Sequence, residues 1–392
     1  MISRITGDHN VSVDVNSRWS LIAAIYMGVI GPAVFIVQPG FVQGLVEYFG
    51  FSEQQAGYVA AAEMWGMAAT TLLMSFFHSR LNWRVLLAWS TLLVAAGNLV
   101  SLGTQSVAEF AVIRGITGVG SGVLVSLSFT VIGLTDKPDR NFGYLIMWVL
   151  TYGAAGFLLM PTAYALIGMK GVLVFFALFS LSALPFIRLL PVSGEEHRDI
   201  NQDAVDVSGV MKLMAIAAMF VYFVAQGVMW AYLFLIGTNG GASEQTVANG
   251  LTLSQFLGIA GAFVAAMLGD RFGRISPLTL AILGSVASLL FLFDQFSAAI
   301  YTFAVCLFNF AWNLTHPFLL AAMASFDRAG KLVTDAVAAQ MLGLAVGPAL
   351  AASVLRPDDY SAVIWLGVFL FVMSLLLILP PLIRQRSASK IK

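Results

Sequence analysis

Long apolar runs, separated by short polar stretches, occupy most of this 392-residue chain. Each run is close to the ~20 residues that an α-helix needs to cross the hydrocarbon core of a bilayer. None alternates polar and apolar positions over about ten residues, as the strands of a transmembrane β-barrel do. Because backbone groups in lipid must pair within their own segment, the pattern predicts an all-α membrane protein with twelve transmembrane helices. The predicted spans cover residues 19–41, 55–77, 84–104, 107–134, 142–167, 171–190, 210–237, 246–268, 276–294, 298–325, 332–355 and 360–383.

The positive charges between these runs predict how the chain crosses the bilayer. If the N-terminus is cytoplasmic, 17 of the 20 Lys and Arg residues fall in cytoplasmic segments, whereas Lys170 and Arg356 fall on the opposite side. Cytoplasmic loops normally carry such an excess. The polar tail before the first run lacks the apolar core of a cleaved signal peptide. We therefore expect a multi-pass protein of the cell inner (plasma) membrane with both termini in the cytoplasm.

The two halves of the chain repeat each other. Ser52-Glu53-Gln54 recurs as Ser243-Glu244-Gln245, an offset of 191 residues. The same offset relates Arg80 to Arg271, Asp136 to Asp327, and Gly156 to Gly347. A polar, acidic stretch between the halves has the character of a flexible linker. We therefore expect two pseudo-symmetric six-helix bundles, at 1–190 and 209–392, joined by a cytoplasmic linker at 191–208.

Composition excludes several classes of protein. The chain is 59% hydrophobic and only 10% charged, whereas soluble domains carry about 25% charged residues. Its net charge is zero and its basic residues do not cluster, so nothing indicates nucleic-acid binding. The single Cys306 and four scattered histidines offer no metal site, and no motif of an intramembrane enzyme is present. We expect no metal, no cofactor and no enzymatic activity.

The loop after the eighth run reads Gly269-Asp270-Arg271-Phe272-Gly273-Arg274 and resembles the loop signature of the major facilitator superfamily of transporters. In that family the loop joins the second and third helices of a half and latches one conformation. The resemblance implies the family's fold of two six-helix bundles, with the substrate near the midplane between them. It also implies that Asp270, Arg271 and Arg274 are gating residues. The equivalent first-half loop, 78–84, keeps the basic residues but lacks the Gly and the Asp.

Glycine-rich segments in two further runs are similar to the family in part. The fourth run carries Arg114 followed by a series of glycines that includes Gly118 and Gly122, like the family's fourth-helix pattern. Glycines one turn apart let a neighbouring helix pack closely. The fifth run matches the family's antiporter signature only partly, and a Gly343…Gly347-Pro348 version lies in the eleventh run. The direction of transport therefore stays open.

Two charged residues inside predicted spans are candidates for proton coupling. A charge at the bilayer centre costs about 2.5–3.5 kcal/mol on insertion scales, so such residues usually face the bundle interior and have a function. Glu63 in the second span and Arg114 in the fourth lie at similar depth. We hypothesise that they interact, and that protonation of Glu63 releases Arg114 or the substrate. A permanent structural pair and direct substrate contact are the alternatives.

Polar residues in the tenth span are the predicted substrate contacts of the second half. Asn309, Asn313 and His316 are spaced four and three apart, which places them on one helix face. Family architecture lines the cavity with the first, fourth, seventh and tenth helices. Interhelical hydrogen bonding is the alternative role, and His316 can instead serve as a proton acceptor. Weaker candidates for substrate binding are Gln38, Gln226, Gln255 and Gln340.

The sequence thus predicts a secondary active transporter that moves a small organic solute across the inner membrane by alternating access. Arg114 favours an anionic or carbonyl-bearing substrate, and the otherwise neutral spans favour an organic acid or an aromatic compound. We expect proton symport by a monomer in the lipid bilayer, with Na⁺ as the alternative coupling ion. A multidrug or metabolite proton antiporter is the main alternative. A transporter-like receptor and an intramembrane enzyme are more remote.

Overall fold

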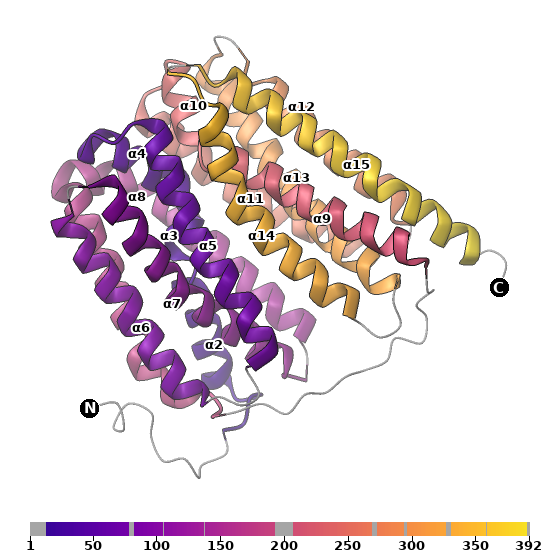
Figure 1. Cartoon of the computed structure of the whole chain (residues 1–392), viewed down its shortest axis with the longest axis horizontal. Coiled ribbons are helices and arrows are strands. Elements are labelled where there is room, and N and C mark those ends of the chain that lie inside the picture. Colours follow the sequence, from indigo (N-terminus) through magenta and orange to yellow (C-terminus); the bar gives the residue numbers. More distant parts are fainter. Residues whose placement is uncertain are drawn as a thin grey trace. The chain divides into compact units, whose positions relative to one another are not determined.

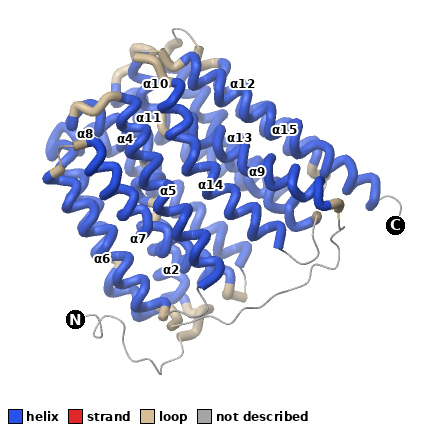
Figure 2. The backbone as a smooth tube through the Cα atoms, viewed as in Figure 1, coloured by secondary structure: helices blue, strands red, loops and turns tan. Residues whose placement is uncertain are grey.

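A computed structural model describes residues 13–77, 82–104, 106–136, 138–192, 207–268, 273–293, 296–326, 331–357 and 359–389. Within these ranges the chain is built from helices, and no strand forms (Figure 2). The helices are α2 (Arg18–Ile30), α3 (Ala33–Ile36), α4 (Gln38–Phe49), α5 (Glu53–Phe77), α6 (Trp83–Val100), η2 (Ser101–Gly103), α7 (Val107–Gly133), α8 (Pro138–Leu181), η3 (Leu184–Leu189), α9 (Gly209–Trp230), α10 (Leu233–Asn239), α11 (Glu244–Leu268), α12 (Ile275–Leu290), α13 (Ala298–Ser325), α14 (Lys331–Val354) and α15 (Ser361–Ser389).

Most of these helices have the length and polarity of membrane spans. Among the described residues, eight helical segments are long and apolar enough to cross a bilayer, and α2 and α12 are shorter apolar helices. The 44 residues of α8 would extend ~66 Å if straight, about twice the thickness of the hydrocarbon core. Gly168 interrupts it with a φ of 62° and a ψ of −179°, so α8 is two spans. Taking α2–α4 and α9–α10 each as one interrupted helix, the described segments make twelve spans.

The first and seventh spans are interrupted helices. The first ends at Phe49 rather than near residue 41, and it is broken after Ile30 and at Val37. Pro32 explains the first break because it has no backbone N–H to continue the helix. The seventh span breaks at Ala231 and Tyr232, between α9 and α10. Just after this break, the Tyr301 hydroxyl donates a hydrogen bond at 2.9 Å to the carbonyl of Leu233, the first residue of α10.

The helices of the two halves keep the register that the sequence repeat predicts. Both ends of α5 and of α11 differ by 191 residues, and α7 and α13 start 191 residues apart. Ser17 and Ser208, separated by the same offset, cap α2 and α9 by accepting hydrogen bonds from the Ser20 and Met211 amides. Serine is a favoured N-cap because its oxygen satisfies an amide that the helix leaves unpaired.

The chain divides into two compact units. Unit 1 comprises Met1–Gly153 and Leu159–Arg198, and unit 2 comprises Ala154–Leu158 and Asp199–Lys392. In unit 1, α2, α5 and α6 each pack against α7 (Figure 1). In unit 2, α11 and α12 pack against α13, while α14 and α15 pack against α9. Each unit therefore buries one or two central helices on which polar side chains can be shielded from lipid.

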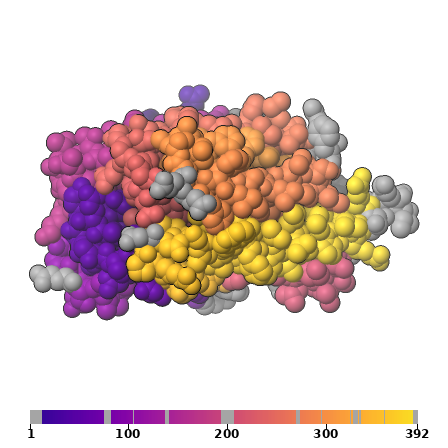
Figure 3. All heavy atoms as spheres, turned by 90° about the horizontal axis from the view of Figure 1, so that it is seen from above, coloured from indigo at the N-terminus to yellow at the C-terminus, as the bar shows by residue number. Residues whose placement is uncertain are grey.

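The outer faces of the spans are apolar. On α15, drawn in yellow in Figure 3, Trp365, Phe369 and Leu376 are each more than half exposed. The buried side of the same helix carries Ser374, whose hydroxyl donates to the Ala218 carbonyl of α9 at 2.8 Å. Large apolar side chains outside and a hydrogen-bonded hydroxyl inside are expected of a helix that faces lipid on one side and protein on the other.

Candidate functional site

The polar centre of unit 1 lies where α5 and α7 approach each other closely. A Cβ atom on Gly118 of α7 would overlap the backbone carbonyl oxygen of Glu63 on α5. Likewise, a Cβ on Gly66 of α5 would overlap the carbonyl oxygen of Gly115 on α7. Only glycine permits such backbone contact, as in small-residue packing between membrane helices. The predicted role of Gly118 as a close-packing residue thus has its partner in α5.

At this crossing, Glu63 and Arg114 form a bidentate ion pair. Nη2 of Arg114 donates to Oε1 of Glu63 at 2.6 Å, and Nε donates to Oε2 at 3.0 Å. The Arg114 side chain is completely buried and that of Glu63 is 7% exposed. The ring of Phe41, from α4, lies 5.3 Å from the guanidinium carbon. The structure therefore brings together the two charged residues singled out in the sequence, in the planar fork geometry that arginine and carboxylate favour.

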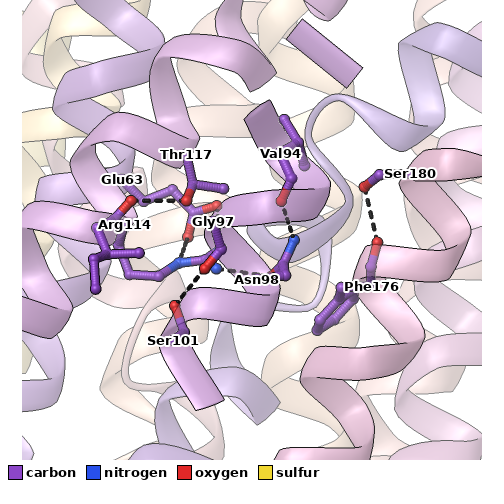
Figure 4. Close-up of polar contacts among 10 residues, drawn as sticks. Glu63, Val94, Gly97, Asn98, Ser101, Arg114, Thr117, Phe176 and Ser180 are labelled. Atoms are coloured by element: carbon purple, nitrogen blue, oxygen red, sulfur yellow. Dashed lines mark hydrogen bonds and ion pairs between the residues drawn. The ribbon is translucent and has the colours of Figure 1, made fainter. Parts of the chain in front are cut away.

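Asn98 of α6 is a third member of this cluster. Its Oδ1 accepts a hydrogen bond from Nη1 of Arg114 at 2.8 Å, and its Nδ2 donates to the Val94 carbonyl at 2.9 Å (Figure 4). Asn98 is 1% exposed. Asn98 was not among the residues predicted from the sequence, although an asparagine within an apolar run was a visible signal. Glu63, Asn98 and Arg114 come from three different helices and are hereafter called the charge cluster.

The charge cluster combines a fixed cation with a group that can change its charge. A guanidinium stays protonated, whereas a carboxylate can take up a proton. Removing one partner of a buried ion pair typically costs 3–5 kcal/mol, because the other charge is left uncompensated. Neutralising Glu63 would therefore destabilise this arrangement of α5 and α7, because the charge of Arg114 would be left buried without compensation.

Polar residues of unit 2 form two hydrogen-bonded groups rather than one continuous stripe. Nδ2 of Asn313 donates to both the backbone oxygen and the Oδ1 of Asn309, each at 2.9 Å. Asn309 in turn donates to the Ser254 hydroxyl of α11 at 3.2 Å. Gly258, on α11, leaves space for both amides, since a Cβ there would lie 2.8 Å from Asn313 Nδ2. This geometry suits interhelical bonding as well as substrate contact.

His316 belongs to the second of these groups. Its Nε2 lies 2.9 Å from Oε1 of Gln340, on α14. The edge of its ring meets the ring of Phe223, on α9, with centroids 5.1 Å apart. Although it shares α13 with Asn309, it thus contacts a different neighbouring helix. Gln340, which the sequence marked as a weaker candidate, is its hydrogen-bond partner.

The remaining predicted glutamines are buried at separate places. Gln226 is fully buried and donates to the Tyr222 hydroxyl at 2.9 Å, while its Oε1 accepts no hydrogen bond from the described residues. Gln38, at the start of α4, and Gln255, on α11, likewise bury one amide atom without a partner among those residues. A buried polar atom without a partner is costly. These three side chains therefore have hydrogen-bonding capacity that a bound solute could use.

The predicted gate is only partly visible. Asp270 and Arg271 lie outside the described residues, and Arg274 is the N-cap residue of α12. In the first half, Arg84 is buried at the start of α6, where its Nε donates to the Leu190 carbonyl at 2.7 Å. The Trp83 amide donates to the Val192 carbonyl at 2.9 Å. The basic loop residue of this half thus binds the end of its own unit.

Comparison with known families finds a match over most of the chain. A family model described as "Major Facilitator Superfamily" matches residues 20–333. No curated protein matches the chain.

Solved structures that resemble the chain include three transporters. The nucleoside transporter NupG is 11% identical, with a TM-score of 0.70 over 92% of this chain and 98% of that one. A D-xylose–proton symporter is 19% identical, with a TM-score of 0.70 over 92% and 97% of the two chains. The xylose transporter XylE from E. coli, in a partially occluded inward-open conformation, is 16% identical, with a TM-score of 0.71 over 91% and 95%. At these identities the likeness establishes the fold, and it confirms the predicted arrangement of twelve helices in two bundles.

Proposed function

Because the chain belongs to the major facilitator superfamily, and is therefore a multi-pass membrane transporter, we propose that it moves a small organic solute together with protons by alternating access. The observation that carries the coupling is the charge cluster, in which a carboxylate and a guanidinium are buried against each other at the crossing of two spans. Glu63 is the proton-binding residue in this proposal.

The proposed coupling step is the release of Arg114. With Glu63 ionised, two of the N–H groups of Arg114 are held by its carboxylate at 2.6 and 3.0 Å. A proton on Glu63 removes the attraction between the charges and converts one carboxylate oxygen into a donor. The two N–H groups of Arg114 that Glu63 held are then available to an anionic group. Proton uptake and binding of an organic anion thereby become linked, which is the condition for symport.

For the substrate, we favour an organic acid or an aromatic compound. The middle of the described spans of unit 2 offers amides and aromatic rings rather than charges. Trp230 and Trp312 meet edge to face with ring centroids 5.6 Å apart. Trp230 lies one turn of α9 after Gln226, whose Oε1 has no hydrogen-bond partner among the described residues. Aromatic rings with a few hydrogen-bonding groups are typical of sites for planar organic ligands. We further propose a monomer in the inner membrane with both termini in the cytoplasm, consistent with the distribution of basic residues.

The test is pH-driven uptake into proteoliposomes. Counterflow with a panel of aromatic and aliphatic carboxylic acids first identifies a transported solute, because counterflow requires no net proton movement. Accumulation of that solute is then measured with an imposed pH gradient for the wild type and for Glu63→Gln. Glu109→Gln is the matched control, since it makes the same chemical change at an exposed residue in the first turn of α7.

We expect Glu63→Gln to retain counterflow and to lose at least about tenfold in pH-driven accumulation, while Glu109→Gln resembles the wild type. A symmetrical elution peak on size-exclusion chromatography separates loss of coupling from misfolding. Undiminished accumulation by folded Glu63→Gln would show that the proton binds elsewhere. Accumulation driven from the opposite side would identify an exporter.

A further inference from the structure

Asn98 is placed to act on the proposed coupling without binding the proton itself. Among the described residues, the Arg114 guanidinium forms hydrogen bonds with two side chains, those of Glu63 and Asn98. Asn98 reaches the guanidinium from α6, whereas Glu63 reaches it from α5. Arg114 is therefore held from two sides by residues on two different helices.

The orientation of the Asn98 amide follows from its two hydrogen bonds. Its NH₂ group donates to the Val94 carbonyl, which is an obligate acceptor. Its oxygen consequently points at the guanidinium, which is an obligate donor. The reverse orientation would set donor against donor and acceptor against acceptor. Asn98 is thus a fixed acceptor anchored to its own helix one turn back.

The charge cluster gives this acceptor a distinct electrostatic role. Glu63 and Asn98 both accept hydrogen bonds from the Arg114 guanidinium. A stronger acceptor at position 98 would stabilise the guanidinium further, so that losing the charge of Glu63 would cost less free energy. A missing acceptor leaves the carboxylate of Glu63 as the main partner of Arg114. The balance between these two partners affects how readily Glu63 takes up a proton.

We infer that Asn98 is a positioning residue that holds Arg114 while Glu63 is protonated and so sets the pH at which transport is coupled. This inference rests on the proposed function of Glu63. With Glu63 neutral, Asn98 still accepts from Nη1, so the guanidinium stays attached to α6 while α5 is released. The helix that moves away from Arg114 is then α5.

Other titratable groups on the surrounding helices are not in contact with Arg114 in any described interaction. Glu47 of α4 pairs with Gln43 at 3.2 Å, Glu53 begins α5, and Glu109 lies in the first turn of α7. Arg84 lies at the opposite end of α6 from Asn98. The remaining titratable side chains on α2, α4 and α5 are Arg18, Tyr26, Tyr48 and Tyr58. Glu63 is therefore the group whose proton uptake Asn98 can influence through Arg114.

Two substitutions at Asn98 should shift the pH dependence of transport in opposite directions. Asn98→Asp places a second carboxylate on Arg114, and repulsion between like charges favours the neutral form of Glu63. The pH of half-maximal uptake should then rise by about one unit or more. Asn98→Leu, of similar size, removes the acceptor and leaves Glu63 to compensate Arg114 alone. The pH of half-maximal uptake should fall.

The experiment measures initial uptake against pH in proteoliposomes for the wild type and both variants. Ser101→Ala is the control, because Ser101 is also buried near the end of α6 but donates only to the Gly97 carbonyl, at 2.7 Å. Its profile should match the wild type. A purely structural role would lower the rates of both Asn98 variants without opposite shifts, and that outcome overturns the inference.

A comparison with Glu63→Gln separates the inference from the function on which it rests. If Glu63→Gln loses pH-driven accumulation but the Asn98 profiles shift together or not at all, only the role of Asn98 is wrong. If Glu63→Gln keeps full accumulation, the proposed function itself fails. Should Asn98→Leu not fold, Asn98→Asp alone still decides, because an unchanged or lowered pH midpoint contradicts the inference.

Discussion

The contact between Gly118 and the backbone of Glu63 leads to a sharp prediction for Gly118→Ala. A Cβ at this position would overlap the Glu63 carbonyl oxygen and would lie 3.1 Å from the Met67 amide nitrogen. Both neighbours are backbone atoms of α5, so no side chain can move aside to make room. The substitution must push α5 and α7 apart.

The size of the displacement can be worked out from the next glycine along the crossing. A Cβ on Gly122 would lie 2.6 Å from the Met67 carbonyl oxygen, whereas C–H···O contacts normally span about 3.3–3.6 Å. Relieving even that shortfall separates the helices by roughly 1 Å, and the overlap at Gly118 is more severe. The Glu63–Arg114 bonds of 2.6 and 3.0 Å would then lengthen beyond the ~3.5 Å at which a hydrogen bond is lost.

We therefore expect Gly118→Ala to lower the free energy of unfolding by about 1–3 kcal/mol, as overpacking does, and to weaken pH-driven accumulation severalfold. Gly115→Ala is an exacting control on the same helix, because its Cβ would meet Ala62 at an ordinary 3.5 Å. Alanine gains about 0.5–1 kcal/mol over glycine in a helix, so this control should be as stable as the wild type or more so. Thermal unfolding in detergent and uptake in proteoliposomes measure the two effects. Equal stability and coupling for the two variants would refute the reasoning.

Two further predictions concern other parts of the chain. Gln340→Leu removes the 2.9 Å hydrogen bond to His316. We expect the free energy of unfolding to fall by about 0.6 kcal/mol, the average for such bonds between membrane helices, with pH-driven accumulation retained. Lost accumulation would show that this pair of residues takes part in transport. Asp359, in the loop before α15, accepts a hydrogen bond from the Ser361 amide at 2.9 Å, and this bond lowers the pKa of the carboxyl. A carboxyl group whose pKa is lower in the folded than in the unfolded state stabilises the fold only where it is ionised. Asp359→Asn should therefore reduce the melting temperature slightly at neutral pH. The difference should disappear as the pH falls below about 4, and a constant difference across this range would contradict the assignment.

Sequence patterns predicted the spans because backbone groups in lipid must be hydrogen-bonded within the segment, which favours long apolar helices. The offset of 191 residues that relates Ser52-Glu53-Gln54 to Ser243-Glu244-Gln245 also relates α5 to α11 in the structure. The break between α9 and α10 could not be predicted from hydropathy, because the residues on both sides of it are apolar. Hydropathy shows which segments are apolar enough to lie in lipid, but it does not show where the helix within such a segment is interrupted.

The charge cluster was predictable in part for a related reason. Charged residues inside a span are rare, which made Glu63 and Arg114 conspicuous, and their similar depth suggested contact. Asn98 was missed because a neutral amide in an apolar run has many roles, and its partner is settled only by how α6 packs against α7. Asn309, Asn313 and His316 all lie on α13, and their spacing placed them on one helix face. The spacing did not show that His316 bonds to Gln340 on α14.

Direct recording of proton movement tests the central claim, that Glu63 carries the coupling proton. In a weakly buffered suspension of proteoliposomes without an imposed gradient, adding the transported solute should make the external medium alkaline as protons enter with it. The wild type and Glu109→Gln should give this signal, and Glu63→Gln should give solute exchange without it. Proton entry of wild-type size in Glu63→Gln, or solute entry without any pH change in the wild type, would contradict the account.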